Sequence, residues 1–235
     1  MNKTIIELVG VPGSGKSAVA EGLHKQLRNL ASTLVTTKPI VYRRRSRATR
    51  FLMQARFHLR YWRTVAGLYR VGVRRGTRTS LRRAATIAVD TARLHHAAEQ
   101  LQDRQFTIMD QGVLQQLIRY LESLPEDAVR ESAISVVEGQ RRQLAATGVQ
   151  WFFLVVDTPS DIAAERIARR QSRSGEFDRL ASNLRTEALL RTYTTQQRVL
   201  DAIREGRTNV AAVDGSRPLE DVIREAALVV ESMIS

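Results

Sequence analysis

The octapeptide GVPGSGKS at residues 10–17 constrains the fold of this chain more than any other stretch. It joins an apolar run, TIIELV, to a helical pattern, SAVAEGLHKQL. In this order, the glycines let backbone N–H groups turn toward a phosphate, and the positive N-terminal end of the helix faces the same anion. Lys16 is expected to reach the β- and γ-phosphates of a nucleotide, and the Ser17 hydroxyl to bind Mg²⁺. We therefore predict a strand, a phosphate-binding loop and a helix.

Short apolar runs alternate with longer amphipathic stretches along the rest of the chain. The apolar runs predict strands at residues 4–9, 33–37, 106–109, 150–156 and 210–213. The amphipathic stretches predict helices at residues 16–30, 48–69, 80–102, 113–124, 126–146, 160–170, 183–205 and 218–233. Such alternation is typical of a parallel sheet covered by helices on both faces. We predict one α/β domain over residues 1–235, with a five-stranded parallel sheet.

Composition excludes several classes of protein. The chain has no cysteine, which excludes a disulfide framework and thiolate chemistry. Its longest stretch without a charged residue, residues 143–156, is shorter than the roughly 18 residues that a membrane-spanning helix needs. The opening residues, MNKTIIELVG, lack the pattern of a cleaved signal peptide, so we expect a cytoplasmic protein.

The net charge of +13 is concentrated in one segment. Residues 22–89 contain no Asp or Glu. They hold Lys25, Arg28, Lys38 and fourteen arginines between residues 43 and 83, which gives this segment a charge of +17. The remainder of the chain therefore sums to 13 − 17 = −4. The basic excess calls for a local explanation, and it lies in the enlarged segment between the second and third predicted strands.

Five stretches together resemble the thymidylate kinase and deoxynucleoside kinase group of P-loop kinases. They are GVPGSGKS, the KP at residues 38–39, FTIMD ending at Asp110, VVDTPSDIAAERIARRQSRSGEFDRL and VAAVDGSRPLEDV. The resemblance runs discontinuously over most of the chain and leaves residues 40–105 unmatched. It implies the P-loop nucleoside triphosphate hydrolase fold and an ATP-dependent kinase that transfers a γ-phosphoryl group to a small acceptor. Homodimers are common in this group.

The resemblance also implies roles for individual residues. The ATP phosphates and Mg²⁺ would be held by Gly13, Ser14, Gly15, Lys16 and Ser17. Asp110 would lie near Mg²⁺ and the acceptor, where it is the best candidate for a general base. Its competing roles are to bind Mg²⁺ and to cap the helix that starts near residue 113.

Further matched residues concern the adenine and the transferred phosphoryl group. Arg166 would flank the adenine, with the backbone around Ser216 and Arg217 on its other side. Arg170 and Arg173 would belong to a lid at about residues 170–180 and approach the phosphoryl group. Arginines suit this place because phosphoryl transfer depends on positioning and charge neutralisation.

Two departures from the group bear on the acceptor. Gln111 and Gly112 follow Asp110, where the group usually has Arg. Lys38 stands where the group usually has a Glu that handles the sugar hydroxyl of a nucleoside. A lysine reverses the local charge, which favours an anionic acceptor such as a nucleotide or a phosphorylated or carboxylated metabolite over a neutral nucleoside.

Several interpretations of the Arg-rich segment at about residues 40–83 stay open. As an acceptor-binding flap, it would place Lys38, Arg43, Arg56 and Arg60 on an anionic acceptor. As a nucleic-acid-binding segment, it would make the chain a nucleotide-gated ATPase. As a basic amphipathic helix, it would contact an anionic membrane and a lipid-linked sugar. A kinase of an antibiotic and a merely solvated basic face are the remaining alternatives.

Asp157 precedes Thr-Pro-Ser at the start of a predicted helix. This pattern is typical of a helix N-cap, so a capping role is expected for its side chain. The histidines show no metal-ligand spacing, and we expect them in the core or in solvent.

Overall fold

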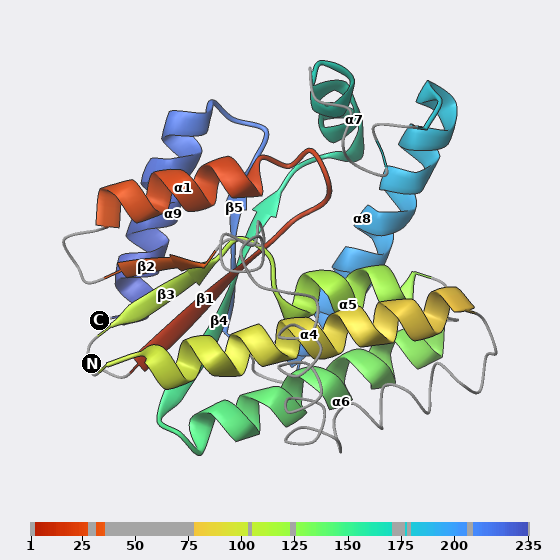
Figure 1. Ribbon diagram of the computed structural model, residues 1–235. Helices are drawn as coiled ribbons and strands as arrows, with labels where there is room; N and C mark the ends of the chain where they lie inside the picture. The colour runs from red at the N-terminus through yellow and green to blue at the C-terminus, as the bar shows by residue number, and fades with distance from the viewer. Residues whose placement is uncertain are drawn as a thin grey trace, which may run out of the picture.

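One parallel sheet organises the molecule, for which the computed structural model describes residues 3–27, 32–35, 78–102, 105–122, 126–170, 177, 180–205 and 209–234. The strands are β1 (Lys3–Val9), β2 (Ser32–Val35), β3 (Phe106–Met109), β4 (Val149–Asp157) and β5 (Val210–Asp214). Their order in the sheet is β2-β3-β1-β4-β5, and every neighbouring pair is parallel (Figure 1). All strands therefore end at the same edge, where ligands of open α/β sheets bind.

The central strand β1 alternates its side chains between two cores. Ile5 and Val9 belong to one buried cluster, and Ile6 and Leu8 belong to the other. Strand β4 follows the same alternation along its apolar run. Near-continuous apolar runs are typical of parallel strands that are buried on both faces.

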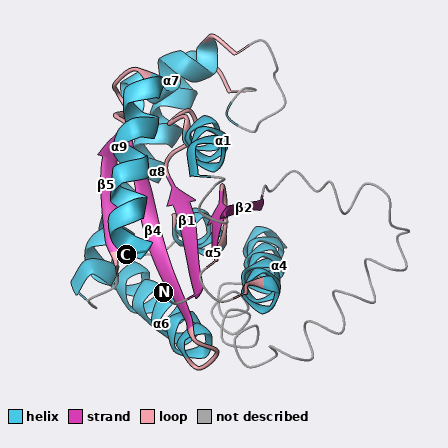
Figure 2. Ribbon diagram, turned by 90° about the vertical axis from the view of Figure 1, so that its left-hand side faces the viewer, coloured by secondary structure: helices cyan, strands magenta, loops and turns pink. Residues whose placement is uncertain are grey.

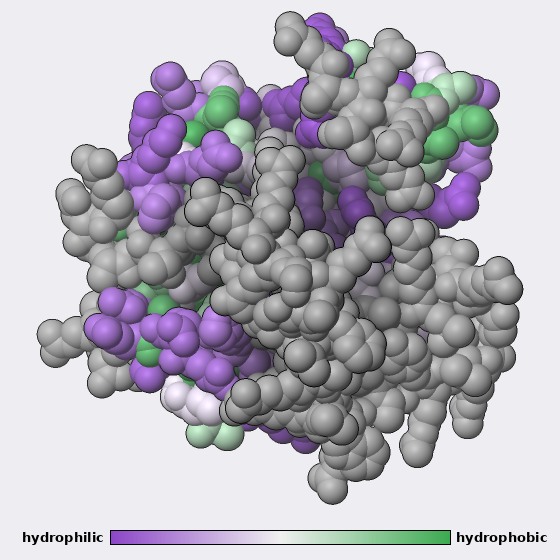
Figure 3. Space-filling view, viewed as in Figure 1, coloured by the Kyte–Doolittle hydropathy of each residue, from purple (hydrophilic) through white to green (hydrophobic). Residues whose placement is uncertain are grey.

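Helices cover both faces of the sheet (Figure 2). Their bounds are α1 (Lys16–Leu27), α4 (Arg78–Gln100), α5 (Val113–Leu121), α6 (Glu126–Ala145), α7 (Ser160–Ala168), α8 (Ser182–Glu205) and α9 (Leu219–Ile234). Helices α1 and α9 pack on one face, and α4, α5, α6 and α8 pack on the other. Hydrophilic residues cover the outer side of α1 in Figure 3.

The prediction of a parallel sheet with helices on both faces is confirmed. Helix α7 ends at Ala168, two residues before the predicted end. The predicted helix at residues 48–69 lies outside the described residues. Among the helices that the structure does describe, none is both long and apolar enough to span a membrane.

The expected capping role of Asp157 is wrong. Pro159 is the N-cap residue of α7, and no side chain makes a capping hydrogen bond there. Asp157 is instead the last residue of β4, and its Oδ1 accepts a hydrogen bond from Gln197 Nε2 at 3.4 Å. Its carboxylate also bonds with the Tyr193 hydroxyl and is one of the causes that raise the pKa of that group, after burial. Packing of α8 against the end of β4 therefore overrides the local capping pattern.

Candidate active site

The loop between β1 and α1 has the backbone geometry of a phosphate cradle. Gly13 and Gly15 have φ angles of 90° and 88°, which glycine adopts at little cost and other residues avoid. A Cβ atom on Gly13 would lie 2.4 Å from the carbonyl oxygen of Ala163, inside α7. The loop is therefore both turned and tightly backed. Such a turn at a helix N-terminus directs successive backbone N–H groups toward one anion.

Lys16 begins α1 and is only 6% exposed. Burial lowers the pKa of its ammonium group to about 8. The positive charge of Arg119 lowers this pKa further, that of Arg170 does so to a smaller extent, and the negative charge of Asp110 opposes the shift. A buried ammonium with two cations nearby is costly in free energy. This part of the site favours an anion with several negative charges.

Arg166 ties the phosphate-binding loop to the turn that follows β5. Its Nη1 donates hydrogen bonds to the carbonyl oxygens of Ser14 at 3.3 Å and Gly215 at 2.8 Å. Thr158 Oγ1 donates to the same Ser14 oxygen at 3.3 Å. Arg166, which the resemblance places beside the adenine, thus joins the phosphate-binding loop to the turn after β5. The resemblance implies that the adenine lies between these two segments.

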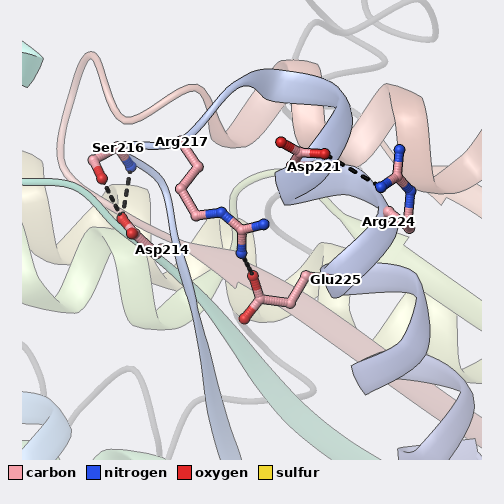
Figure 4. Close-up of polar contacts among 6 residues, drawn as sticks. All are labelled: Asp214, Ser216, Arg217, Asp221, Arg224 and Glu225. Atoms are coloured by element: carbon pink, nitrogen blue, oxygen red, sulfur yellow. Dashed lines mark hydrogen bonds and ion pairs between the residues drawn. The ribbon is translucent and has the colours of Figure 1, made fainter.

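The turn after β5 is held by its own side chains (Figure 4). Asp214 Oδ1 accepts hydrogen bonds from the backbone N–H of Ser216 at 2.9 Å and from its hydroxyl at 2.5 Å. These bonds hold the pKa of Asp214 below its usual range. Arg217 forms an ion pair of 2.7 Å with Glu225 on α9. The Arg217 side chain is therefore directed along α9.

Three carboxyl groups gather below the end of β3, and sequence reasoning identified only one of them. Asp110 follows β3 and is 6% exposed. Glu7 on β1 and Asp90 on α4 are buried as well. Asp90 forms an ion pair of 2.7 Å with Arg93. Burial raises the pKa of Asp90 to about 6, an effect that Arg93 opposes and the charge of Asp110 strengthens.

Glu7 caps α5 from the neighbouring strand. Its Oε1 accepts hydrogen bonds from the backbone N–H groups of Leu114 at 2.8 Å and Gln115 at 3.1 Å. Burial raises the pKa of Glu7 to about 8, which the backbone bonds oppose and the charge of Asp90 strengthens. The group is therefore mostly protonated at pH 7. Glu7 therefore supplies cap bonds to α5, whose N-cap residue is Gly112, and the capping role of Asp110 stays a prediction.

Helix α5 also touches the phosphate-binding loop. Gln115 Oε1 accepts a buried hydrogen bond of 3.1 Å from the backbone N–H of Gly10. This bond joins the first residue of the loop to the first turn of the helix that follows Asp110. The signal that sequence reasoning overlooked was the lone Glu7 within the apolar run TIIELV, since an acid there must be buried by its neighbours.

The structure brings only part of the predicted site together. Lys16, Asp110 and Arg170 interact electrostatically, and Arg166 lies against the loop backbone. The other described candidates belong to the GVPGSGKS motif or to the turn after β5. They are Gly13, Ser14, Gly15, Ser17, Ser216 and Arg217. The candidates outside the described residues are Arg173, Lys38, Arg43, Arg56 and Arg60.

Solved structures share this architecture at low sequence identity. Deoxyadenosine kinase from M. mycoides with bound dCTP aligns with a TM-score of 0.50 and 12% identity, over 97% of this chain and 99% of that chain. Shikimate kinase from Bacteroides thetaiotaomicron aligns with a TM-score of 0.51 and 11% identity, over 97% and 98% of the two chains. At this level of identity the likeness concerns the fold. No curated protein matches the sequence.

A match to a family profile assigns the chain to a protein family, which the solved structures do not do. The profile of the family described as an AAA domain matches residues 5–196. That range begins in β1, includes the phosphate-binding loop and Asp110, and ends within α8. The chain belongs to this AAA domain family and has the P-loop nucleoside triphosphate hydrolase fold.

Proposed function

We propose that this protein is an ATP-dependent kinase that transfers the γ-phosphoryl group to a small anionic acceptor. The observation that carries the proposal is the buried Lys16 ammonium beside Arg119, Arg170 and Asp110, at the mouth of a loop with two glycines of positive φ. The cations favour a polyphosphate, and the carboxylate supplies an acid–base group beside it.

The phosphate end of the site follows from the loop geometry. The backbone N–H groups of Gly13 and Gly15 would bind the phosphates, and Lys16 would reach the β- and γ-phosphates. The N–H of Ser14 is donated within the loop, to the carbonyl oxygen of Val11 at 3.0 Å. The exposed Ser17 hydroxyl in the first turn of α1 and the Asp110 carboxylate would hold Mg²⁺. These oxygen donors fit Mg²⁺, which commonly uses one or two protein oxygens together with nucleotide phosphates and water. Bound Mg²⁺ would neutralise phosphate charge.

Asp110 has a second task in this proposal, and the arginines have one each. Asp110 accepts the proton of the acceptor group. The acceptor oxygen attacks the γ-phosphorus, and the bond between the γ-phosphorus and the leaving oxygen of ADP breaks. Arg170 and Arg173, from the lid at about residues 170–180, neutralise charge on the transferred group. Arg166 and the backbone at Ser216 and Arg217 hold the adenine between the two loops that Arg166 joins.

The acceptor is proposed to be a nucleotide or a phosphorylated or carboxylated metabolite. Two fold neighbours are kinases of small molecules, which supports an acceptor of that size. The charge of +17 between residues 22 and 89 supports an anion. In this proposal residues 40–83 close over the acceptor as part of one domain, with Lys38, Arg43, Arg56 and Arg60 as anion ligands. A thymidylate kinase-like subtype is part of the same proposal.

The test is acceptor-dependent formation of ADP. Purified protein is incubated with ATP and Mg²⁺ and a panel of nucleotides, sugar phosphates and carboxylated metabolites, and ADP is measured against ATP alone. At least one anionic acceptor is expected to raise the rate. Lys16→Ala should abolish that increase, whereas the exposed Lys25→Ala on the same helix should retain it. A panel without any increase, or transfer that survives in Lys16→Ala, would contradict the proposal.

A further inference from the structure

Helix α5 carries a cation that neither the sequence motifs nor the family resemblance indicates. Arg119 lies in the last turn of α5, four residues after Gln115. Residues four apart lie on the same side of a helix. Since Gln115 Oε1 accepts the N–H of Gly10, this side of α5 faces the phosphate-binding loop. The fold therefore directs Arg119 toward the loop as well.

Two further observations agree with this placement. The Nε atom of Arg119 is buried, although the residue as a whole is only partly covered. The Arg119 charge also acts on the Lys16 ammonium more strongly than that of Arg170 does. The guanidinium group thus lies on the inner side of α5, close to the group that would meet the β- and γ-phosphates.

The first turn of α5 is fixed on two sides, which gives Arg119 a defined position. Glu7 Oε1 binds the N–H groups of Leu114 and Gln115 from below, and Gln115 binds Gly10. At the other end, Glu122 Oε1 accepts a hydrogen bond of 2.8 Å from Thr192 on α8. A cation on a helix held at both ends needs little reorganisation to meet a ligand.

We propose that Arg119 is a catalytic residue that contacts the transferred phosphoryl group, opposite Lys16 and on the side of the acceptor. This inference rests on the proposed kinase function and adds a residue to it. Arg119 enters from the helix that follows Asp110, whereas Arg170 comes from the lid after α7. An arginine suits the place because its planar group can bind two phosphate oxygens at once.

If Arg119 contacts the γ-phosphoryl group, it should affect only the binding of nucleotides that carry this group. The probes are ADP and the non-hydrolysable ATP analogue AMP-PNP, measured by calorimetry with Mg²⁺ and without acceptor. Arg119→Gln is expected to weaken AMP-PNP binding by about 10-fold or more, while ADP binding changes by less than about threefold. Arg119→Lys keeps a positive charge but loses the paired contact, so an intermediate loss is expected.

Arg142→Gln is the matched control, because Arg142 is an exposed arginine on α6 whose Nε donates to the carbonyl oxygen of Glu138. It should leave both affinities unchanged. Circular dichroism and thermal midpoints establish that the variants fold; if Arg119→Gln does not, Arg119→Lys carries the test. Equal losses for ADP and AMP-PNP, or no loss for either, would overturn the inference and leave Arg119 with a structural role or a contact to the acceptor. Because binding needs no turnover, a failure of acceptor-dependent transfer would refute the proposed function and not this contact.

Discussion

Removing the buried charge of Lys16 should make the protein more stable, although it destroys the proposed phosphate site. Lys16→Met keeps an unbranched stem of similar length and deletes the ammonium group. Burial and the neighbouring Arg119 lower the pKa of Lys16 from 10.5 to about 8. Each unit corresponds to about 1.36 kcal/mol. The fall of the Lys16 pKa from 10.5 to about 8 therefore costs the folded state about 3 kcal/mol at pH 7.

The pH dependence has a definite sign. Between about pH 8 and 10.5 the unfolded chain keeps a proton on Lys16 that the folded protein has released. Stability of the wild-type protein therefore rises with pH through this window as far as Lys16 is concerned, and the penalty is gone above it. The stability difference between Lys16→Met and the wild type should close as the pH approaches about 10.5.

Urea denaturation followed by circular dichroism measures this difference at pH 7 and pH 10. With m-values of about 3 kcal/mol/M, the midpoint of Lys16→Met should lie about 1 M higher at pH 7. Lys25→Met on the exposed side of α1 should change stability by no more than about 0.5 kcal/mol. A Lys16→Met variant that is no more stable than the wild type at pH 7, or a stability difference that grows with pH, would show that the buried charge of Lys16 does not destabilise the fold.

Three further predictions concern the supports of the site. Glu7→Gln should leave stability at pH 5 unchanged and remove the loss of stability that the wild type shows as the pH rises from about 5 through 8, because the pKa of Glu7 in the folded protein is raised to about 8. Urea titrations of both proteins measure this, and an unchanged dependence of stability on pH would contradict it. Gly112→Ala should lower the stability by about 1–3 kcal/mol, because its Cβ would lie 2.6 Å from Glu7 Cδ. Gly139→Ala, in open space on α6, should raise the stability by up to about 1 kcal/mol. Thermal midpoints that shift in the same direction for both variants would contradict this packing. Arg166→Ala should weaken ADP binding by about 10-fold in calorimetry, since it removes both bonds between the loops, and an unchanged affinity would show that those bonds do not shape the site.

The parts of the fold that are written in local patterns could be predicted from the sequence. The glycine spacing of residues 10–17 requires a strand before it and a helix after it, and β1 and α1 lie there. The apolar run WFFLVV predicted a strand buried on both faces, which β4 confirms. In each case the residues that determine the element are neighbours in the sequence.

The supports of the site could not be predicted in this way, because they arise from packing between distant elements. Glu7 and Leu114 are 107 residues apart, and Gly10 and Gln115 are 105 residues apart. No spacing rule relates such pairs. Arg119 was one arginine among 33, and only the orientation of α5 separates it from those on solvated faces. Asp157 shows the opposite error, since a local capping pattern was overridden by α8.

The proposed function depends on transfer of the γ-phosphoryl group of ATP to a small molecule. The most direct measurement incubates the protein, Mg²⁺ and the acceptor panel with ATP labelled in the γ-phosphate, beside a parallel reaction labelled in the α-phosphate. We expect γ-label to enter a new anionic compound, α-label to stay out of it, and Lys16→Ala to abolish the transfer. Label that stays in ATP or is released only as inorganic phosphate with every acceptor would contradict it.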